Sequence, residues 1–134
     1  MKSTISHLVI NVKPKNLLFY KDLFSFLGWN VLFEEGGFLG MGCEGGSRLW
    51  FGAGLKDLDN DYDGRGMNHL AIGVDSQSEV DQVVEYLKEK KVDALFETPR
   101  HRPEFSSPGN TYYQVMFESP DRVLFEVVYI GVKQ

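Results

Sequence analysis

The sequence predicts an α+β fold made of two copies of one βαβββ module. Two nearly identical phrases lead to this prediction, ISHLVINV at 5–12 and MNHLAIGV at 67–74, offset by 62 residues from His7 to His69. Both phrases are apolar runs of strand length, and each is followed by a helical pattern and then by three further strand candidates. A repeat of this size indicates two equivalent units that share a core.

The first module covers residues 5–54. After its opening strand, Pro14 suits the first turn of a helix and Gly28 suits its end. Between them, apolar residues recur at helical spacing, at Leu17, Tyr20, Phe24 and Leu27. Strand candidates follow at 29–33, 38–43 and 47–54.

The second module covers residues 67–130. Ser76 and Glu79 form a capping box at the start of its helix. The apolar stripe of this helix consists of Val80, Val83, Val84 and Leu87. Strand candidates follow at 92–96, 111–117 and 122–129. Because one such module cannot bury its sheet face alone, we expect residues 1–134 to form a single domain.

The composition argues against several classes of protein. The chain has 134 residues, 43% of them hydrophobic, and a net charge of −5, which suits one compact core. It has no Lys/Arg-rich run, which argues against nucleic acid as a partner, and no apolar run long enough to span a membrane. Cys43 is the only cysteine, which excludes an intrachain disulfide and favours a cytoplasmic location.

Two segments lie outside the repeat. Within the segment 55–66, the residues Asp59, Asp61, Asp63 and Gly64 resemble the opening of a calcium loop. The twelfth position counted from Asp59 is Leu70 rather than glutamate, so we expect a solvated acidic linker. Residues 99–110 are rich in proline and glycine, and we expect a loop that carries Arg100 and Arg102. His101, between these arginines, is expected to be solvated or to face a substrate.

Both strand histidines are expected to point away from the helices. Because side chains alternate along a strand, His69 lies on the face opposite the apolar Leu70 and Ile72, and His7 has the same place in its strand. Glu126 is a carboxylate inside an otherwise apolar strand, and burying it without a partner is costly. Two imidazoles and one carboxylate suggest a site for Zn, Fe(II), Mn, Ni or Co that leaves positions open for a substrate.

Each of these residues also has a plain structural interpretation. A single strand histidine is commonly a satisfied core residue or a surface residue, and Glu126 alone could pair with a lysine or arginine. Duplication alone could also preserve a histidine of purely structural use. The equivalent places of His7 and His69 in the repeat favour the metal site.

The chain resembles the vicinal oxygen chelate superfamily, which includes glyoxalase I, extradiol dioxygenases, fosfomycin-resistance thiol transferases and bleomycin-resistance proteins. The likeness rests on the paired modules, the strands HLVINV and HLAIGV, the helix end LFYKDLFSFLGW and the closing SPDRVLFEVVY. It implies an incomplete barrel-like mixed-sheet cleft with helices on the outside, and a homodimer. The family's usual acidic-Pro-Asp-Gly turn has Arg122 here in place of the glycine.

The resemblance also implies a ligand set and a chemistry. Carried over, the metal ligands are His7, His69 and Glu126. Trp50 occupies the fourth ligand position, where glyoxalase I has a glutamate, which weighs against glyoxalase I activity. The implied function is a divalent-metal-dependent enzyme of the glyoxalase/dioxygenase type, whose small-molecule substrate chelates the metal through adjacent oxygens.

The substrate-binding residues that we expect are Trp50, Tyr113, Arg100 and Arg102. Trp50 could form a pocket wall or pack in the core, and the arginines could close over an anionic substrate or stay solvated. Tyr113 and Gln114 lie on opposite faces of their strand, so at most one of them faces the site. No residue stands out as the general base. The alternative function is metal-free binding or sequestration of a small, antibiotic-like molecule.

Overall fold

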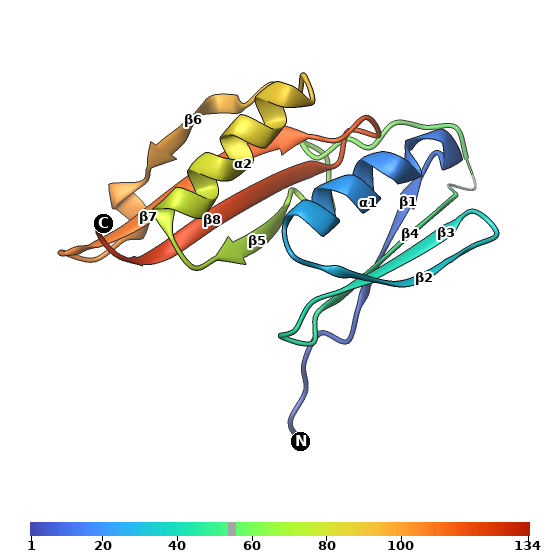
Figure 1. The fold of residues 1–134 in the computed structure, drawn as a ribbon, viewed down its shortest axis with the longest axis horizontal. Coiled ribbons are helices and arrows are strands. Elements are labelled where there is room, and N and C mark those ends of the chain that lie inside the picture. The colour runs from blue at the N-terminus through green and yellow to red at the C-terminus, as the bar shows by residue number, and fades with distance from the viewer. Residues whose placement is uncertain (54–55) are drawn as a thin grey trace. The chain divides into compact units, whose positions relative to one another are not determined.

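The computed structural model describes residues 1–53 and 56–134, so the expected module end at 54 and linker start at 55 lie outside the described residues. The chain divides into two compact units, Met1–Asp59 and Asn60–Gln134. The modules expected at 5–54 and 67–130 fall within these units. Each unit contains a four-stranded sheet and an α-helix (Figure 1).

The first unit contains β1 (Leu8–Val12), a 3-10 turn (Pro14–Asn16), α1 (Leu17–Phe26), β2 (Asn30–Glu35), β3 (Phe38–Gly42) and β4 (Arg48–Ala53). Its sheet has the strand order β1-β4-β3-β2, in which β1 and β4 are parallel. The core lies between α1 and the sheet, where Tyr20, Phe24 and Phe51 are fully buried. The Tyr20 ring stacks on Phe51 with 4.5 Å between ring centroids.

The second unit contains β5 (Leu70–Val74), α2 (Gln77–Glu89), β6 (Leu95–His101), a 3-10 turn (Pro103–Phe105), β7 (Asn110–Glu118) and β8 (Leu124–Val132). Its strand order, β5-β8-β7-β6, repeats the topology of the first sheet. The internal duplication predicted from the sequence is therefore confirmed. α2 runs across β7 and β8 (Figure 1).

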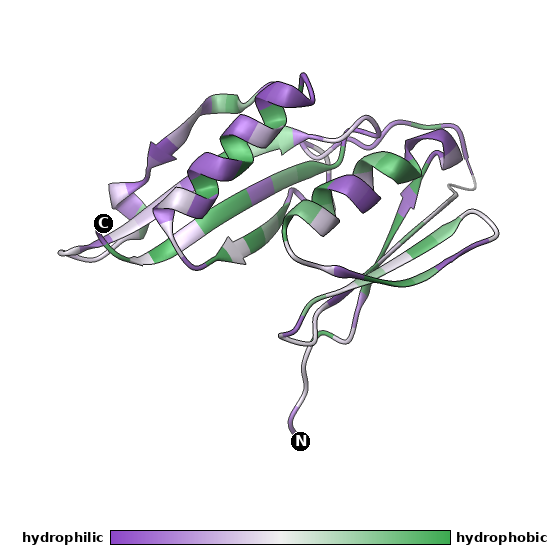
Figure 2. Cartoon of the chain, viewed as in Figure 1, coloured by the Kyte–Doolittle hydropathy of each residue, from purple (hydrophilic) through white to green (hydrophobic). Residues whose placement is uncertain are grey.

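The start of α2 follows the predicted capping box. Ser76 Oγ accepts a hydrogen bond from the backbone N–H of Glu79 at 3.2 Å. The helix buries Val80, Val83 and Leu87 against the sheet. Hydrophilic and hydrophobic residues alternate along α2, whereas β8 is mainly hydrophobic (Figure 2). The described helices are all too short or too polar to cross a membrane.

The two sheets have equivalent registers. In the first sheet Val9 pairs with Trp50, and in the second Ala71 pairs with Glu126. Val9 and Ala71 are matching positions of the repeat, so Trp50 is the structural counterpart of Glu126.

Two local predictions are wrong. Residues 99–101, expected in a loop, belong to β6, where Arg100 pairs with Gln114. Pro99 is tolerated because β6 is an edge strand, which does not need every backbone donor. The linker is also not wholly solvated, because Tyr62 is only 8% exposed and packs with Met116 and Leu124.

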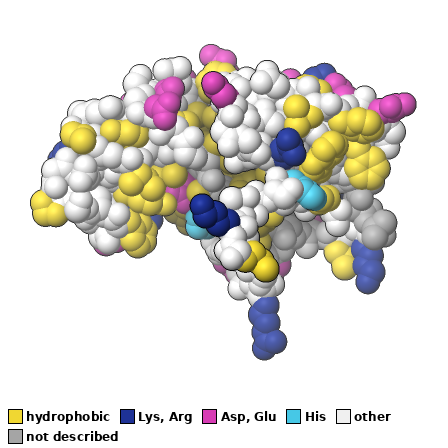
Figure 3. Space-filling model, turned by 90° about the horizontal axis from the view of Figure 1, so that it is seen from below, with side chains coloured by type: hydrophobic (Ala, Val, Ile, Leu, Met, Phe, Trp, Pro, Cys, Tyr) yellow, Lys and Arg dark blue, Asp and Glu magenta, His cyan; other side chains and the backbone are white. Residues whose placement is uncertain are grey.

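In the first sheet, glycine makes room for a large side chain on the face away from α1. A Cβ atom at Gly40 would lie 2.6 Å from the Trp50 ring, and that ring also lies 6.0 Å from the ring of Phe33. Trp50 therefore packs within its own sheet. Phe33 and Phe38 are partly exposed on this unit, and hydrophobic side chains form several surface patches (Figure 3).

Candidate functional site

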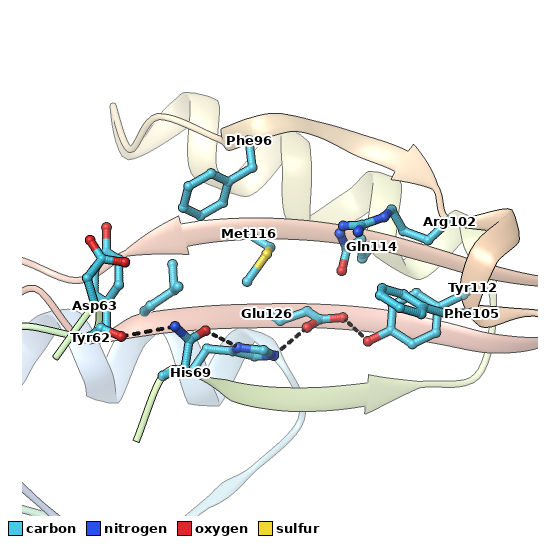
Figure 4. Close-up of a pocket in the computed structure, with 12 residues that line it drawn as sticks. Tyr62, Asp63, His69, Phe96, Arg102, Phe105, Tyr112, Gln114, Met116 and Glu126 are labelled. Carbon is cyan, nitrogen blue, oxygen red and sulfur yellow. Dashed lines mark hydrogen bonds and ion pairs between the residues drawn. The ribbon is translucent and has the colours of Figure 1, made fainter. Parts of the chain in front are cut away.

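A pocket of about 650 Å³ lies in the second unit (Figure 4). All of its lining residues come from 60–134, and most of those on strands lie on the sheet face opposite α2. The polar lining residues are Tyr62, Asp63, Asn68, His69, Arg102, Tyr112, Gln114 and Glu126. The apolar ones are Phe96, Phe105, Met116 and Leu124. The pocket thus combines ionisable groups with aromatic walls, as ligand sites commonly do.

His69 and Glu126 meet inside this pocket. His69 precedes β5, Glu126 lies in the neighbouring parallel strand β8, and His69 Nε2 is 2.9 Å from Glu126 Oε2. The side chain of Glu126 is 2% exposed, whereas that of His69 is 34% exposed. The structure therefore brings together two of the three predicted metal ligands.

The second carboxylate oxygen of Glu126 is held by neighbours on β7. The Tyr112 hydroxyl donates to Glu126 Oε1 at 2.5 Å. With its amide nitrogen oriented toward the carboxylate, Gln114 donates to the same oxygen at 2.7 Å. Burial, followed by this contact with Glu126, raises the pKa of Tyr112 to about 12. Oε1 is thus satisfied by the protein, and Oε2 is the oxygen left for His69.

Asn68 determines which nitrogen of His69 carries a hydrogen. Its Nδ2 donates to the backbone oxygen of Tyr62 at 3.0 Å, so its Oδ1 faces His69 Nδ1 at 2.7 Å (Figure 4). An amide oxygen only accepts hydrogen bonds, so Nδ1 must be the donor.

The other ring nitrogen then faces a carboxylate oxygen. A neutral imidazole has one N–H, so with Nδ1 protonated, His69 Nε2 presents a lone pair to Glu126 Oε2 at 2.9 Å. A proton or a metal cation between these two atoms satisfies both. Imidazole nitrogen and carboxylate oxygen are ligands of divalent transition metals, so the pair fits such an ion.

Arg102 forms the cationic end of the pocket. Its Nε donates to Glu104 at 2.5 Å, its Nη1 donates to the oriented Gln114 oxygen at 3.1 Å, and its guanidinium lies 4.8 Å from the centre of the Phe105 ring. The hydrogen bond from Arg102 lowers the pKa of Glu104. Gln114 therefore links the guanidinium to the Glu126 carboxylate.

The sequence predicts four further site residues besides His69, Glu126 and Arg102. His7 and Trp50 belong to the first unit, and His7 Nδ1 lies 3.0 Å from Ser6 Oγ. Tyr113 donates to Asp81 of α2 at 2.7 Å and does not line the pocket. Arg100 is also absent from the lining and lies 3.6 Å from Glu97. In residues 1–53 and 56–134, no three His, Cys, Asp or Glu side chains are gathered as a metal-binding group.

Sequence reasoning missed several residues of the pocket. Tyr112 and Gln114 both line the pocket, so the alternation that sets Tyr113 and Gln114 on opposite faces could also have grouped Tyr112 with Gln114. Asn68 lies next to His69, but nothing in the sequence indicates that its amide faces the imidazole. Phe105 is the last residue of a 3-10 turn whose position the sequence does not indicate.

Several solved structures of other proteins have the same fold as this chain. No family profile matches the sequence. A putative glyoxalase from Bacillus halodurans is similar over 96% of both chains, with 25% identity and a TM-score of 0.79. A glyoxalase/dioxygenase from Nostoc punctiforme is similar over 95% of this chain and 90% of its own, with 19% identity and a TM-score of 0.73. The chain has the vicinal oxygen chelate fold.

Another protein with the vicinal oxygen chelate fold was solved with a metal. It is the fosfomycin resistance protein FosX from Listeria monocytogenes, in complex with Mn(II) and sulfate. It is similar over 96% of this chain and 91% of its own, with 24% identity and a TM-score of 0.68. Among curated proteins, the uncharacterized protein YqjT of Bacillus subtilis is 40% identical over 63 residues, which span 47% of this chain and 46% of YqjT. The match thus covers about half the length of that relative.

Proposed function

We propose that the protein is a divalent-metal-dependent enzyme of the glyoxalase/dioxygenase type that acts on a small molecule with two adjacent oxygens. The observation that supports this proposal is the approach of His69 Nε2 to Glu126 Oε2 at 2.9 Å, with Nδ1 already held by Asn68. A lone pair of His69 Nε2 and a lone pair of Glu126 Oε2 then face each other inside the pocket, and a cation between them would be bound by both atoms.

The metal ligands in this proposal are His7, His69 and Glu126. Tyr112 and Gln114 hold one oxygen of Glu126 and leave the other for the cation. His7 comes from the first unit, either of the same chain or of a second copy in a homodimer. The chemistry that a bound divalent cation supplies is Lewis-acid stabilisation of negative charge on the substrate's oxygens.

The substrate in this proposal carries an anionic group. Arg102 is the only lysine or arginine among the described residues that line the pocket. Its guanidinium is oriented by Glu104, Gln114 and Phe105, so little side-chain freedom is lost when it binds an anion. The apolar part of the substrate would lie against Phe96 and Met116.

Metal binding tests the proposal directly. We expect the purified protein, titrated with Mn²⁺ or Zn²⁺ in a calorimeter, to bind one ion per chain. His69→Ala, Glu126→Gln and His7→Ala should each abolish that binding, because each removes a ligand. His101→Ala is the matched control, because His101 does not line the pocket and bonds to Thr111. Unchanged affinity in His69→Ala would contradict the assignment.

A titration of oxalate onto the metal-loaded protein tests the anionic substrate class. Oxalate carries adjacent oxygens and negative charge, so we expect Arg102→Ala to weaken its binding at least about tenfold, the effect of one lost charge-assisted hydrogen bond. Arg100→Ala is the control, because Arg100 lies outside the pocket. Equal effects of the two substitutions would contradict a specific role for Arg102.

Metal-free sequestration of a small molecule is the second candidate function. It is favoured by two aromatic rings in the pocket wall, Phe96 and Phe105, which are 51% and 57% exposed. A protein that takes up no metal but whose melting temperature rises with a bleomycin-type ligand would support this function. Loss of that rise in Phe105→Ala would locate the ligand in the pocket.

The proposed assembly is a homodimer in the cytoplasm. Light scattering on the purified protein should give twice the mass of 15.2 kDa for one chain. A monomer that still binds one metal per chain would show that a second copy is not needed to complete the site.

A further inference from the structure

We infer that Asn68 is the positioning residue of this site: its amide orients the His69 imidazole with Nδ1 as donor and Nε2 toward Glu126. The inference rests on the proposed metal site, but it concerns a residue that neither the sequence pattern nor the ligand set assigns. It follows from two hydrogen bonds made by one amide group.

The amide cannot be reversed without loss. Asn68 Nδ2 donates to the backbone oxygen of Tyr62 at 3.0 Å, and Oδ1 faces His69 Nδ1 at 2.7 Å. A flipped amide would place its NH₂ group against Nδ1 and its oxygen against the Tyr62 carbonyl, so two acceptors would meet. The orientation of Asn68 is therefore set by the backbone of the linker.

The linker backbone is itself anchored on the second unit. The Tyr62 ring is buried, its hydroxyl donates to Glu118, and the guanidinium of Arg122 lies 5.4 Å from the ring centre. Asn60 Nδ2 also donates to the backbone oxygen of Arg122 at 2.9 Å. A short chain of contacts thus runs from the turn before β8, through Tyr62 and Asn68, to His69.

This arrangement matters because a histidine ligand needs a defined tautomer. A hydrogen-bond acceptor on the far nitrogen keeps the hydrogen there and leaves the other nitrogen free for a metal. Without the Asn68 oxygen, the neutral imidazole would place its hydrogen on Nε2, where the Glu126 carboxylate accepts it. That tautomer carries its lone pair on Nδ1 and offers none to a cation at Nε2, beside Glu126.

Three variants test the inference. We expect Asn68→Ala to weaken Zn²⁺ binding by about 10–100-fold, the usual effect of losing a hydrogen-bond partner of a metal ligand. Asn68→Asp keeps an acceptor for Nδ1 and should retain the wild-type affinity or exceed it. Asn60→Ala is the matched control, because it also loosens the linker but does not touch His69.

Equal losses of affinity in Asn68→Ala and Asn68→Asp would overturn the inference, because they would show that the residue acts only by anchoring the linker. Equal losses in Asn60→Ala would have the same meaning. Should Asn68→Ala fail to fold, the comparison of Asn68→Asp with Asn60→Ala still decides between the two roles.

A second readout does not depend on metal. Long-range ¹H–¹⁵N spectra of the metal-free protein, at a pH where the imidazole is neutral, report the tautomer of His69. We expect the share of the Nδ1–H form to fall in Asn68→Ala and to stay unchanged in Asn60→Ala. An unchanged share in Asn68→Ala would contradict the inference. If the wild type bound no Zn²⁺ and the share still fell, the proposed function would fail while the role of Asn68 stood.

Discussion

The Tyr112 hydroxyl donates a 2.5 Å hydrogen bond to the buried carboxylate of Glu126. The two residues lie on the adjacent antiparallel strands β7 and β8, on the sheet face that forms the pocket. Because Glu126 is almost wholly excluded from water, this bond replaces part of the hydration that the carboxylate loses on folding.

Replacing this hydroxyl should destabilise the protein. We expect Tyr112→Phe to lower the free energy of unfolding by about 1.5–3 kcal/mol, the range for a hydrogen bond to a charged group. Tyr113→Phe is the matched control, because its hydroxyl donates to Asp81 on the helix side, at a more exposed contact. Urea unfolding measures both, and an equal or larger loss in Tyr113→Phe would contradict the importance of the buried contact.

Both tyrosines should make the protein sensitive to alkali. Burial is the largest cause that raises the pKa of Tyr112 and that of Tyr113 to about 12, from an ordinary value of 10.0. Between pH 10.0 and about 12 the unfolded chain loses these phenol protons while the folded chain keeps them. Stability is therefore fully present below pH 10.0 and falls as the pH rises toward about 12.

Ultraviolet absorbance of phenolate checks this expectation. Tyr112 and Tyr113 should be among the tyrosines that ionise late in the folded protein, and Tyr112→Phe should remove one late step. Titration of all tyrosines together near the ordinary value would contradict the buried environment.

A glycine at position 122 should relieve backbone strain in the turn before β8. Arg122 has a φ of 57°, in the left-handed region that costs an ordinary residue about 1–2 kcal/mol. Arg122→Gly and Arg122→Ala both remove the contacts with Tyr62 and Glu118, but only glycine removes the backbone strain. We expect the glycine variant to be about 1 kcal/mol more stable than the alanine variant in urea unfolding. Equal stability would contradict strain at this position.

The packing of Trp50 can be tested through the glycine beneath it. We expect Gly40→Ala to cost about 1–3 kcal/mol, because the new Cβ would lie 2.6 Å from the Trp50 ring. Gly73→Ala is the matched control, since no atom lies within 4 Å of its added Cβ. Adding Trp50→Leu should remove most of the cost of Gly40→Ala. A persistent cost in that double variant would point to the backbone instead of the ring.

Much of the fold could be predicted because the elements of the repeat produce patterns among residues that are close together in the sequence. The strand alternation, the Ser76 cap and the apolar stripe of α2 depend on neighbouring residues, and each is found where the sequence predicts it. The strand predicted at 92–96 lies further along the chain, at Leu95–His101, because its pairing with β7 in the folded sheet decides where it begins and ends. The burial of Tyr62 could not be predicted either, because its ring packs against Met116 and Leu124, which lie far along the chain.

The sequence by itself determined the duplicated βαβββ modules, because strand and helix periods are local patterns, and it named His69 and Glu126 as candidates for one site. Only the tertiary structure decided how that pair is held. The orientation of Asn68, the hydroxyl of Tyr112 on Glu126 and the guanidinium of Arg102 beside Gln114 all depend on contacts across strands and loops. Hydrogen bonds need particular atoms at particular distances, and residue spacing along the chain carries no such information.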